Sequence, residues 1–317
     1  MDRIHGRLVP PMHAKTDPVV AILVADIHLA LNPPVCRREE PSWFDAMARS
    51  LDEIDGLRRT HNAPVVCAGD VFDRWNSPPE LINFALDKLP AMSAVPGQHD
   101  LPLHRLDLAH RSAYGTLCRT GKIATFSPGC ACKVAEGVWV QGFPWGVPLI
   151  PCPDHLRKKE GLKIAAVHSF VWLNEDTSYP GAPQSGKVSA SRAAFDGWDA
   201  VVYGDNHKGF LTEVDDTAIL NCGTVFRRTV AEVDYRPHVG LLRASSFIDV
   251  HYLDVSKDVL VVPPKEAKVA PESGLVDFVG ALQSLAGDPL DFEGAMSKAM
   301  RACKDPGVRD ILTEIMA

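Results

Sequence analysis

The chain has 317 residues, a formal net charge of −7 at pH 7 and 46% hydrophobic residues. A chain of this length forms one large domain, or one domain with an appendage, and it can bury a sizeable core. The negative charge excludes a strongly basic nucleic-acid-binding tail. It argues against non-specific DNA binding but leaves room for a local basic groove.

The cysteines and the N-terminal residues indicate the compartment. The chain has eight cysteines, and we expect reduced thiols in a cytoplasmic protein, because a chain of this length needs no disulfides to support its core. Cys130 and Cys132 are the one close pair, and no second pair at zinc-site spacing follows them. Residues 1–17 are polar and broken by proline, so we expect no signal peptide. The longest apolar run, at 19–25, is too short to span a membrane, so we expect no membrane association.

Five short apolar runs predict strands that are buried on both faces. They are VVAILVA at 19–25, APVVCA at 63–68, MSAVP at 92–96, KIAAVH at 163–168 and DAVVYG at 199–204. Three further stretches carry β-forming residues between turn signals, at 133–143, 217–228 and 241–255.

Helical patterns lie between the first three predicted strands. Residues 42–59 place apolar side chains on one stripe, with Ser42 as the predicted N-cap and Asp45 at the third helical position. Residues 77–89 begin with Ser77 as the predicted cap and proline at the helix start. The alternation of strand and helix predicts an α/β fold.

The C-terminal part differs in composition from the rest. Residues 261–273 read VVPPKEAKVAPES, a linker rich in Pro, Lys and Glu, and three apolar stripes at helical spacing follow it. We therefore expect a catalytic domain at 1–260 and a linker with a helical tail at 261–317. The tail either packs on its own domain as a cap or docks on a partner. Residues 174–191 form a polar loop, for which a functional role and a plain surface role both stay open.

Polar side chains follow each of the five predicted strands at the point where the strand ends. In chain order they are Asp26 and His28, then Asp70 and Asp73, then Gln98, His99 and Asp100, then His168, and finally Asp205 and His207. In an open α/β sheet, ligands bind at the carboxyl ends of the strands. The conjunction of these residue types at five strand ends predicts a metal site.

The order of these motifs resembles that of the calcineurin-like metallophosphoesterases. The chain reads DIH, GDVFD, GQHD, VHS and GDNH where that family has D-x-H, G-D-x-x-D, G-N-H-D, a lone His after a strand, and G-H-x-H. The segments GDVFDR and LNCGTVFRR are most similar to the SbcD-type DNA exonuclease branch. The resemblance covers residues 26 to about 228. It implies a four-layer α/β/β/α sandwich, here with a short helical C-terminal appendage.

The resemblance also implies two divalent metal ions. One would be held by Asp26, His28, Asp70 and His207, and the other by Asp70, Gln98, His168 and Asp205. Two of these positions depart from the family pattern: Gln98 replaces the usual Asn, and Asp205 replaces the first His of the last motif. Both can still ligate through oxygen, and the extra methylene of Gln98 adds about 1.5 Å of reach. Because oxygen outnumbers nitrogen among these ligands, Mn²⁺ is favoured, with Mg²⁺, Fe²⁺ and Zn²⁺ as alternatives.

Further roles follow from the same resemblance. His99 would protonate the leaving oxygen of the substrate, and Asp100 would orient the His99 ring. Asp73, which is not itself a ligand, would orient the ligands. Several basic residues could contact a nucleic-acid backbone, although a solvated charged surface explains them equally well. They are Arg227, Arg228 and His104, and also Arg37.

The expected function is phosphodiester hydrolysis. The first interpretation is a DNA exonuclease or endonuclease of SbcD type in DNA repair, recombination or phage DNA processing. Its expected partners are DNA, an SbcC-like ATPase subunit and a second copy of the chain in a homodimer. The alternatives are a phosphatase or phosphodiesterase for small substrates, and a catalytically degenerate scaffold. Retention of both His99 and Asp100 argues against the scaffold.

Overall fold

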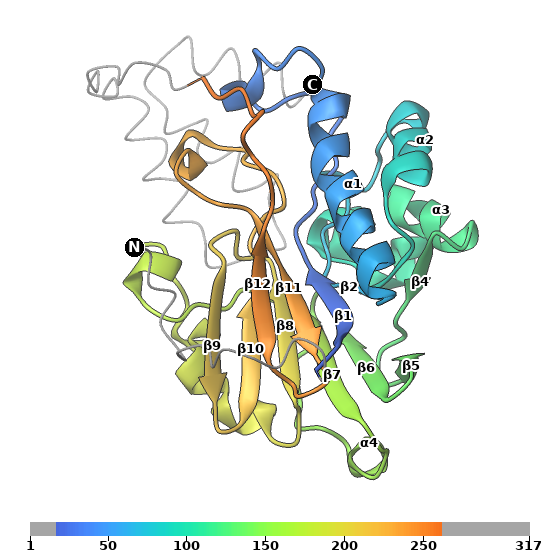
Figure 1. Cartoon of the computed structure of the whole chain (residues 1–317), viewed down its shortest axis with the longest axis vertical. Helices are drawn as coiled ribbons and strands as arrows, with labels where there is room; N and C mark the ends of the chain where they lie inside the picture. The colour runs from blue at the N-terminus through green and yellow to red at the C-terminus, as the bar shows by residue number, and fades with distance from the viewer. Residues whose placement is uncertain (1–16, 262–317) are drawn as a thin grey trace, which may run out of the picture. The chain divides into compact units, whose positions relative to one another are not determined.

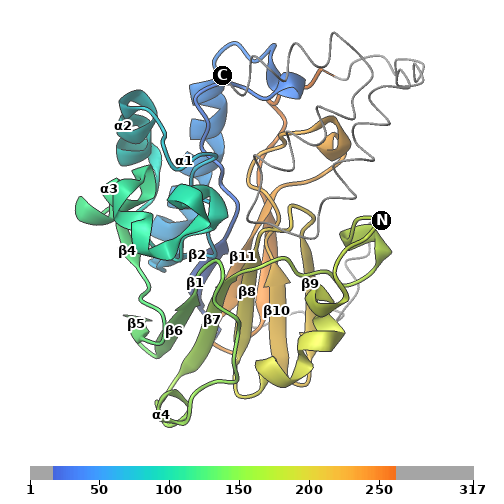
Figure 2. The ribbon, with the colours of Figure 1, turned by 180° about the vertical axis from the view of Figure 1, so that it is seen from behind.

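The protein is described here from a computed structural model, which describes residues 17–261. Two mixed sheets, each of six strands, form its centre, and α1, α2 and α3 gather on one side of them (Figure 1; seen from behind in Figure 2). The helices are α1 (Trp43–His61), α2 (Pro79–Lys88), α3 (Ala113–Arg119) and α4 (Asp154–Arg157).

The first sheet has the spatial order β12-β11-β1-β2-β3-β4. Its strands are β12 (Ile248–Tyr252), β11 (His238–Arg243), β1 (Val19–Val24), β2 (Val65–Cys67), β3 (Met92–Ala94) and β4 (Ile123–Thr125). Strands β1 to β4 run parallel, whereas β11 and β12 pair antiparallel at the other side of β1.

The second sheet has the order β5-β6-β7-β8-β10-β9. Its strands are β5 (Ala131–Ala135), β6 (Val138–Phe143), β7 (Leu162–His168), β8 (Ala200–Gly204), β10 (Thr217–Asn221) and β9 (Phe210–Val214). The four central strands are parallel, and the two edge strands are antiparallel to their neighbours.

The two sheets pack face to face, and side-chain alternation along the strands explains why. In β1, Ala21 and Leu23 pack into the core between the sheets, whereas Ile22 and Val24 pack on the opposite face, in the core with the helices. This is the period of two that a strand imposes. Because both faces are covered, the strand reads as a continuous apolar run.

The predicted α/β fold is confirmed, with a thin fourth layer. All five apolar runs form strands, namely β1, β2, β3, β7 and β8. The outer face of the second sheet is covered by α4 and the 3₁₀ segment η7 (Val188–Phe195), which contribute Leu156, Val188 and Phe195. The loop predicted at 174–191 thus contains short 3₁₀ turns and reaches into this layer.

One predicted helix cap is right and the other is wrong. The Ser42 side chain accepts a hydrogen bond from the Asp45 amide and caps α1. At α2 the cap position belongs to Pro78, which makes no side-chain bond, and the Ser77 hydroxyl instead donates to the Arg74 carbonyl at 2.8 Å. Proline supplies the extended backbone before the helix, so the serine lies one position too early.

The remaining predictions concern the sulfur atoms, the membrane and the tail. The cysteines of the described residues are free, as expected. Within residues 17–261 no helix is long and apolar enough to cross a membrane. The predicted linker and helical tail lie outside the described residues, apart from Val261, so the division at 260 stays a prediction.

Candidate metal centre

The predicted ligands come together because both sheets end at the same place. Asp26 and His28 follow β1, Asp70 follows β2 and Gln98 follows β3, all in the first sheet. His168 ends β7, and Asp205 and His207 follow β8, in the second sheet. Parallel strands deliver their carboxyl ends to one edge, and the two edges meet at the buried polar cluster formed by these residues.

The backbone at this edge adopts conformations that few side chains tolerate. Asp26, His28, Asp70 and Asp205 have φ angles of 50°, 50°, 53° and 95°, in the left-handed region. Each such residue costs about 1–3 kcal/mol and persists only where its surroundings fix it. Here the two loops are bonded to each other, because the amides of Asp26 and His28 donate to the carbonyls of Gly69 and Asp70 at 3.0 and 2.9 Å.

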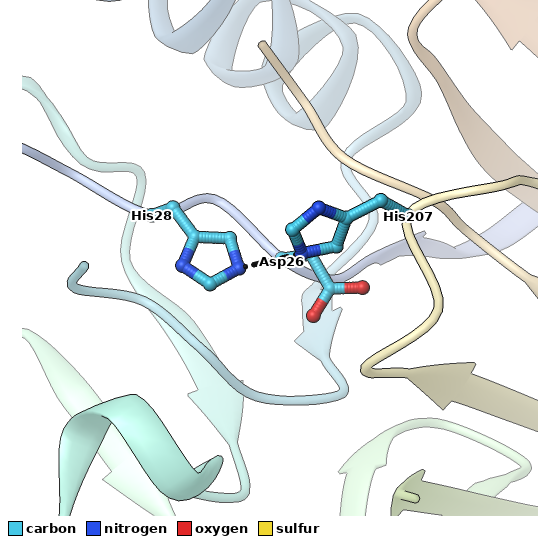
Figure 3. Close-up of side chains that lie close together, drawn as sticks. All are labelled: Asp26, His28 and His207. Carbon is cyan, nitrogen blue, oxygen red and sulfur yellow. Dashed lines mark hydrogen bonds between the residues drawn. The ribbon is translucent and has the colours of Figure 1, made fainter. Parts of the chain in front are cut away.

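The first group of converging side chains consists of Asp26, His28 and His207 (Figure 3). The Nε2 atoms of the two imidazole rings face each other at 3.0 Å. Burial lowers the pKa of both histidines, and the positive charge of Arg228 lowers that of His28 further. Both rings are therefore held neutral, which is the form that binds a metal.

The second group consists of Asp26, Asp70 and His168. His168 Nδ1 lies 2.6 Å from the Ala68 carbonyl and must donate to it, so Nε2 is the atom that faces the cluster. Gln98 Oε1 lies 2.6 Å from that Nε2. Burial alone would lower the pKa of His168, but the carboxylate of Asp70 outweighs it and raises the pKa to about 10.

Asp205 is placed differently from the other predicted ligands. Its backbone amide donates to both carboxylate oxygens of Asp26, at 2.9 and 3.0 Å. Its side chain accepts a hydrogen bond from Gln98 Nε2 at 2.7 Å. Among the described residues it belongs to none of the three groups of closely spaced ligand atoms.

His99 is exposed, and with His28 and Asp70 it forms a third group of closely spaced ligand atoms. Its ring stands 5.0 Å from that of His28, and its backbone amide donates to Asp70 Oδ1 at 3.0 Å. His99 Nδ1 lies 2.8 Å from the carbonyl oxygen of Asp73. Because a carbonyl only accepts, Nδ1 carries a proton, and Nε2 has no hydrogen-bond partner among residues 17–261.

Asp100 is not placed as its predicted role requires. Its carboxylate is fully buried and accepts from the backbone amides of Val71, Phe72 and Gly97, at 3.2, 3.0 and 3.0 Å. Burial, and then the charge of Asp70, raises its pKa to about 7. Asp100 therefore joins the loops after β2 and β3, and the carbonyl of Asp73 is the group that orients His99.

The sequence model described as calcineurin-like phosphoesterase matches residues 20–209. The chain belongs to this family. It is therefore a metal-dependent hydrolase of phosphate esters, as predicted. No curated protein sequence matches the chain.

The solved structures to which this chain is similar share little sequence with it. They include the protein TT1561 of Thermus thermophilus (10% identity, TM-score 0.44, 74% of this chain and 98% of that one) and a novel archaeal phosphodiesterase (12%, 0.38, 74% and 99%). A third is the calcineurin-like phosphoesterase YfkN from Bacillus subtilis (14%, 0.41, 73% and 87%).

The donor set of this phosphoesterase fits the two divalent ions that its family uses. Asp70 Oδ2 is buried and makes no hydrogen bond of good geometry within residues 17–261; the nearest nitrogens are His168 Nε2 at 3.4 Å and His28 Nε2 at 3.6 Å. A buried carboxylate oxygen without a donor is costly unless a cation meets it. Asp70 Oδ2 thus has a histidine of the first group and a histidine of the second beside it, so Asp70 would be a ligand of both ions.

The basic residues predicted to bind substrate are placed unequally. Arg227 is buried, and its guanidinium is bonded to Asp258 and to backbone carbonyls, so the fold uses it, in contrast to the expectation that it contacts a nucleic acid. Arg228 is bonded to Asp73, and its charge acts on His28 and His207.

An aromatic residue that the sequence patterns did not indicate also lies beside the metal-binding cluster. The ring of Trp145 lies 6.3 Å from that of His168 and 6.3 Å from that of His104, which is exposed. Trp145 follows β6, a strand whose end carries no acid or histidine, so a pattern of ligand types does not include it. The signal was an aromatic residue at another strand end of the same sheet.

Proposed function

We propose that this phosphoesterase cleaves phosphodiester bonds in DNA. The observation that carries the proposal is the exposed imidazole of His99 beside the metal-binding cluster, with Nδ1 bonded to the Asp73 carbonyl and Nε2 without a hydrogen-bond partner among the described residues. A diester needs a proton for its alkoxide leaving group, and a positioned imidazolium supplies one.

The DNA substrate is supported by where the two SbcD-like segments lie. Asp73 comes from GDVFDR and Arg228 from LNCGTVFRR, 155 residues apart, and their side chains form an ion pair. This pair is adjacent to both catalytic elements, since the Asp73 carbonyl orients His99 and the Arg228 charge acts on His28. Both segments thus serve one place in the molecule.

The roles of the side chains follow from these contacts. Bound divalent ions supply Lewis-acid chemistry, because they offset phosphate charge and lower the pKa of water. The residues that would hold these ions are Asp26, His28, Asp70, Gln98, His168 and His207. His99 donates through Nε2 to the leaving oxygen, and Arg228 places positive charge beside the phosphate. The oxygens of Asp26, Asp70 and Gln98 suit Mn²⁺.

The test is cleavage of a labelled linear duplex with Mn²⁺, Mg²⁺ or Zn²⁺ added separately, beside bis-p-nitrophenyl phosphate. We expect Mn²⁺-dependent DNA cleavage that His99→Gln reduces by about 10²–10⁴-fold in kcat, with metal content and melting temperature unchanged. His110→Gln is the matched control, because His110 is also exposed and its Nδ1 also faces a backbone carbonyl, that of Asp107 at 3.0 Å.

Two outcomes contradict the proposal. Cleavage of the small diester without cleavage of DNA assigns the site to a small-substrate phosphodiesterase. Metal binding with no hydrolysis of either substrate favours a scaffold. Docking on an SbcC-like ATPase through residues 261–317, homodimerisation and the cytoplasmic location stay predictions.

A further inference from the structure

The two residues that depart from the family pattern contact each other. Gln98 follows β3 in the first sheet and Asp205 follows β8 in the second, 107 residues apart. Gln98 Nε2 donates to Asp205 Oδ1 at 2.7 Å. A change at one position thus has its counterpart at the other.

This contact fixes the orientation of the Gln98 amide. A carboxylate only accepts, so the amide nitrogen must point at Asp205 and the amide oxygen at His168 Nε2, 2.6 Å away. His168 Nδ1 is already bonded to the Ala68 carbonyl. Gln98 Oε1 and Asp70 Oδ2 lie 2.6 and 3.4 Å from His168 Nε2, so these three atoms would hold one ion. In the metal-free protein Gln98 Oε1 and His168 Nε2 share a proton.

The Asp205 side chain has a different place. Its backbone amide is held by the Asp26 carboxylate, and its φ of 95° fixes the direction in which the side chain leaves the chain. One carboxylate oxygen is occupied by Gln98, and the side chain is outside the three groups of converging ligand atoms in residues 17–261.

We propose that Asp205 is a positioning residue for Gln98 and does not itself ligate the second ion. The first ion then has four protein ligands, Asp26, His28, Asp70 and His207, whereas the second has three, Asp70, Gln98 and His168. The two ions bind with unequal affinity, and the second site keeps more positions for water or substrate oxygen. This inference concerns metal binding alone, so it does not depend on whether DNA is the substrate.

The experiment counts bound Mn²⁺ by titration, following the paramagnetic resonance signal of the free ion, in a double-mutant cycle. Wild type is expected to bind two ions in two separable steps. Asp205→Ala should weaken the second step roughly 10–100-fold, as loss of a group that orients a ligand does, and Gln98→Ala should weaken it at least as much. The double variant should match Gln98→Ala alone, because Asp205 acts through Gln98.

A direct ligand predicts another result. If Asp205→Ala weakens the second step by the same factor in the Gln98→Ala background, Asp205 ligates the ion and the inference is overturned. Asp205→Asn covers a failure of the alanine variant to fold, since its Oδ1 still accepts from Gln98. We expect second-step affinity within a few-fold of wild type, and a loss as large as that of Gln98→Ala overturns the proposal. If the double-mutant cycle gives the expected result but the protein does not cleave DNA, the proposed function is wrong and this inference stands.

Discussion

At the scale of single residues, the metal centre depends on the absence of a side chain at Gly97 as well as on its ligands. Gly97 lies so close to the cluster that a Cβ there would stand 2.1 Å from Asp70 Oδ1 and 2.6 Å from His168 Nε2. Real Cβ atoms do not approach other atoms so closely, and buried ligands held by their own bonds have no room to move aside.

Gly97→Ala therefore should disrupt the centre. We expect Mn²⁺ affinity to fall by roughly 10-fold or more and the free energy of unfolding to fall by about 1–3 kcal/mol, measured by metal titration and urea unfolding. Gly56→Ala in α1 is the control, because its Cβ meets nothing within 4 Å. Alanine in a helix should be neutral or stabilise by about 0.5–1 kcal/mol. Wild-type metal binding by Gly97→Ala would refute this account.

His238 in β11 gives the fold a pH dependence outside the metal centre. It is buried between the rings of Tyr235 and Tyr252, with Arg236 stacked on Tyr252, and burial lowers its pKa. Below the unfolded-state pKa of about 6.5, the His238 ring binds a proton in the unfolded chain but not in the folded protein. Stability is therefore lost as pH falls from about 6.5 toward the lowered folded-state pKa.

Urea unfolding of wild type and His238→Gln at pH 7.5 and 5.5 measures this effect. We expect wild type to lose more stability than the variant on acidification, by at most about 1.4 kcal/mol per pH unit for one proton. The exposed His155 supplies the control substitution His155→Gln, which should lose as much as wild type. Equal losses in wild type and His238→Gln would show that His238 does not resist protonation.

At the scale of elements, a buried ionic network joins the loop after β1 to the segment after β12. Arg37 is 2% exposed and bonds Glu40, Asp258 and the carbonyl of Arg227. Burial alone would raise the pKa of Glu40, but the amide of Val259 and the charge of Arg37 hold it below its ordinary value. Arg37 thus has a structural role and is neither the nucleic-acid contact nor the solvated surface charge that the sequence left open.

Removing Arg37 takes the nearest cation from the buried carboxylate of Glu40, which keeps only Arg49 at 3.5 Å, whereas Asp258 remains paired with Arg227. Arg37→Met should reduce the free energy of unfolding by about 3–5 kcal/mol, measured by urea unfolding. The neighbouring Arg38 is exposed, so Arg38→Met should change stability by less than about 0.5 kcal/mol. Glu40→Gln in the Arg37→Met background should recover part of the loss. Equal effects of the two arginine substitutions would exclude the network as a source of stability.

An element could be predicted from the sequence where local patterns determine it, and not where contacts between distant segments do. Continuous apolar runs predicted the strands β1, β2, β3, β7 and β8, because burial on both faces leaves a local pattern. The strand β4 was not predicted because two of its three residues are exposed, so no apolar run marks it. The seven-residue helix α3 was not predicted because so short a helix carries little periodicity. Strand ends placed the ligand types together, but the partners of Asp100 and Gln98 depend on side-chain direction and on contacts between distant segments. Adjacent Arg227 and Arg228 differ for the same reason: one side chain turns into the fold and the other to the site.

At the scale of the whole described unit, the metal centre links two sheets that otherwise meet through apolar packing. Asp26, His28 and Asp70 belong to the first sheet, and His168 and His207 to the second. Two of the carboxylates are fully buried. Without cations, burial raises the pKa of Asp26 well above its ordinary value, which measures how poorly that charge is tolerated. Metal binding therefore should stabilise the packing of one sheet on the other.

Metal removal tests this coupling. Ions that bind only the folded protein stabilise it by about 2.7 kcal/mol at roughly 100 times Kd, so chelation should lower the melting temperature by roughly 5–10 °C for a protein of this size. The melting temperature should rise with the logarithm of free Mn²⁺, and His28→Ala should flatten that dependence because it removes a ligand from the first sheet. His110→Gln should leave it unchanged, since His110 is exposed and bonded only to its own loop. If stripped and loaded protein melt together, the centre is formed by the fold alone and the ions add nothing to the contact between the sheets.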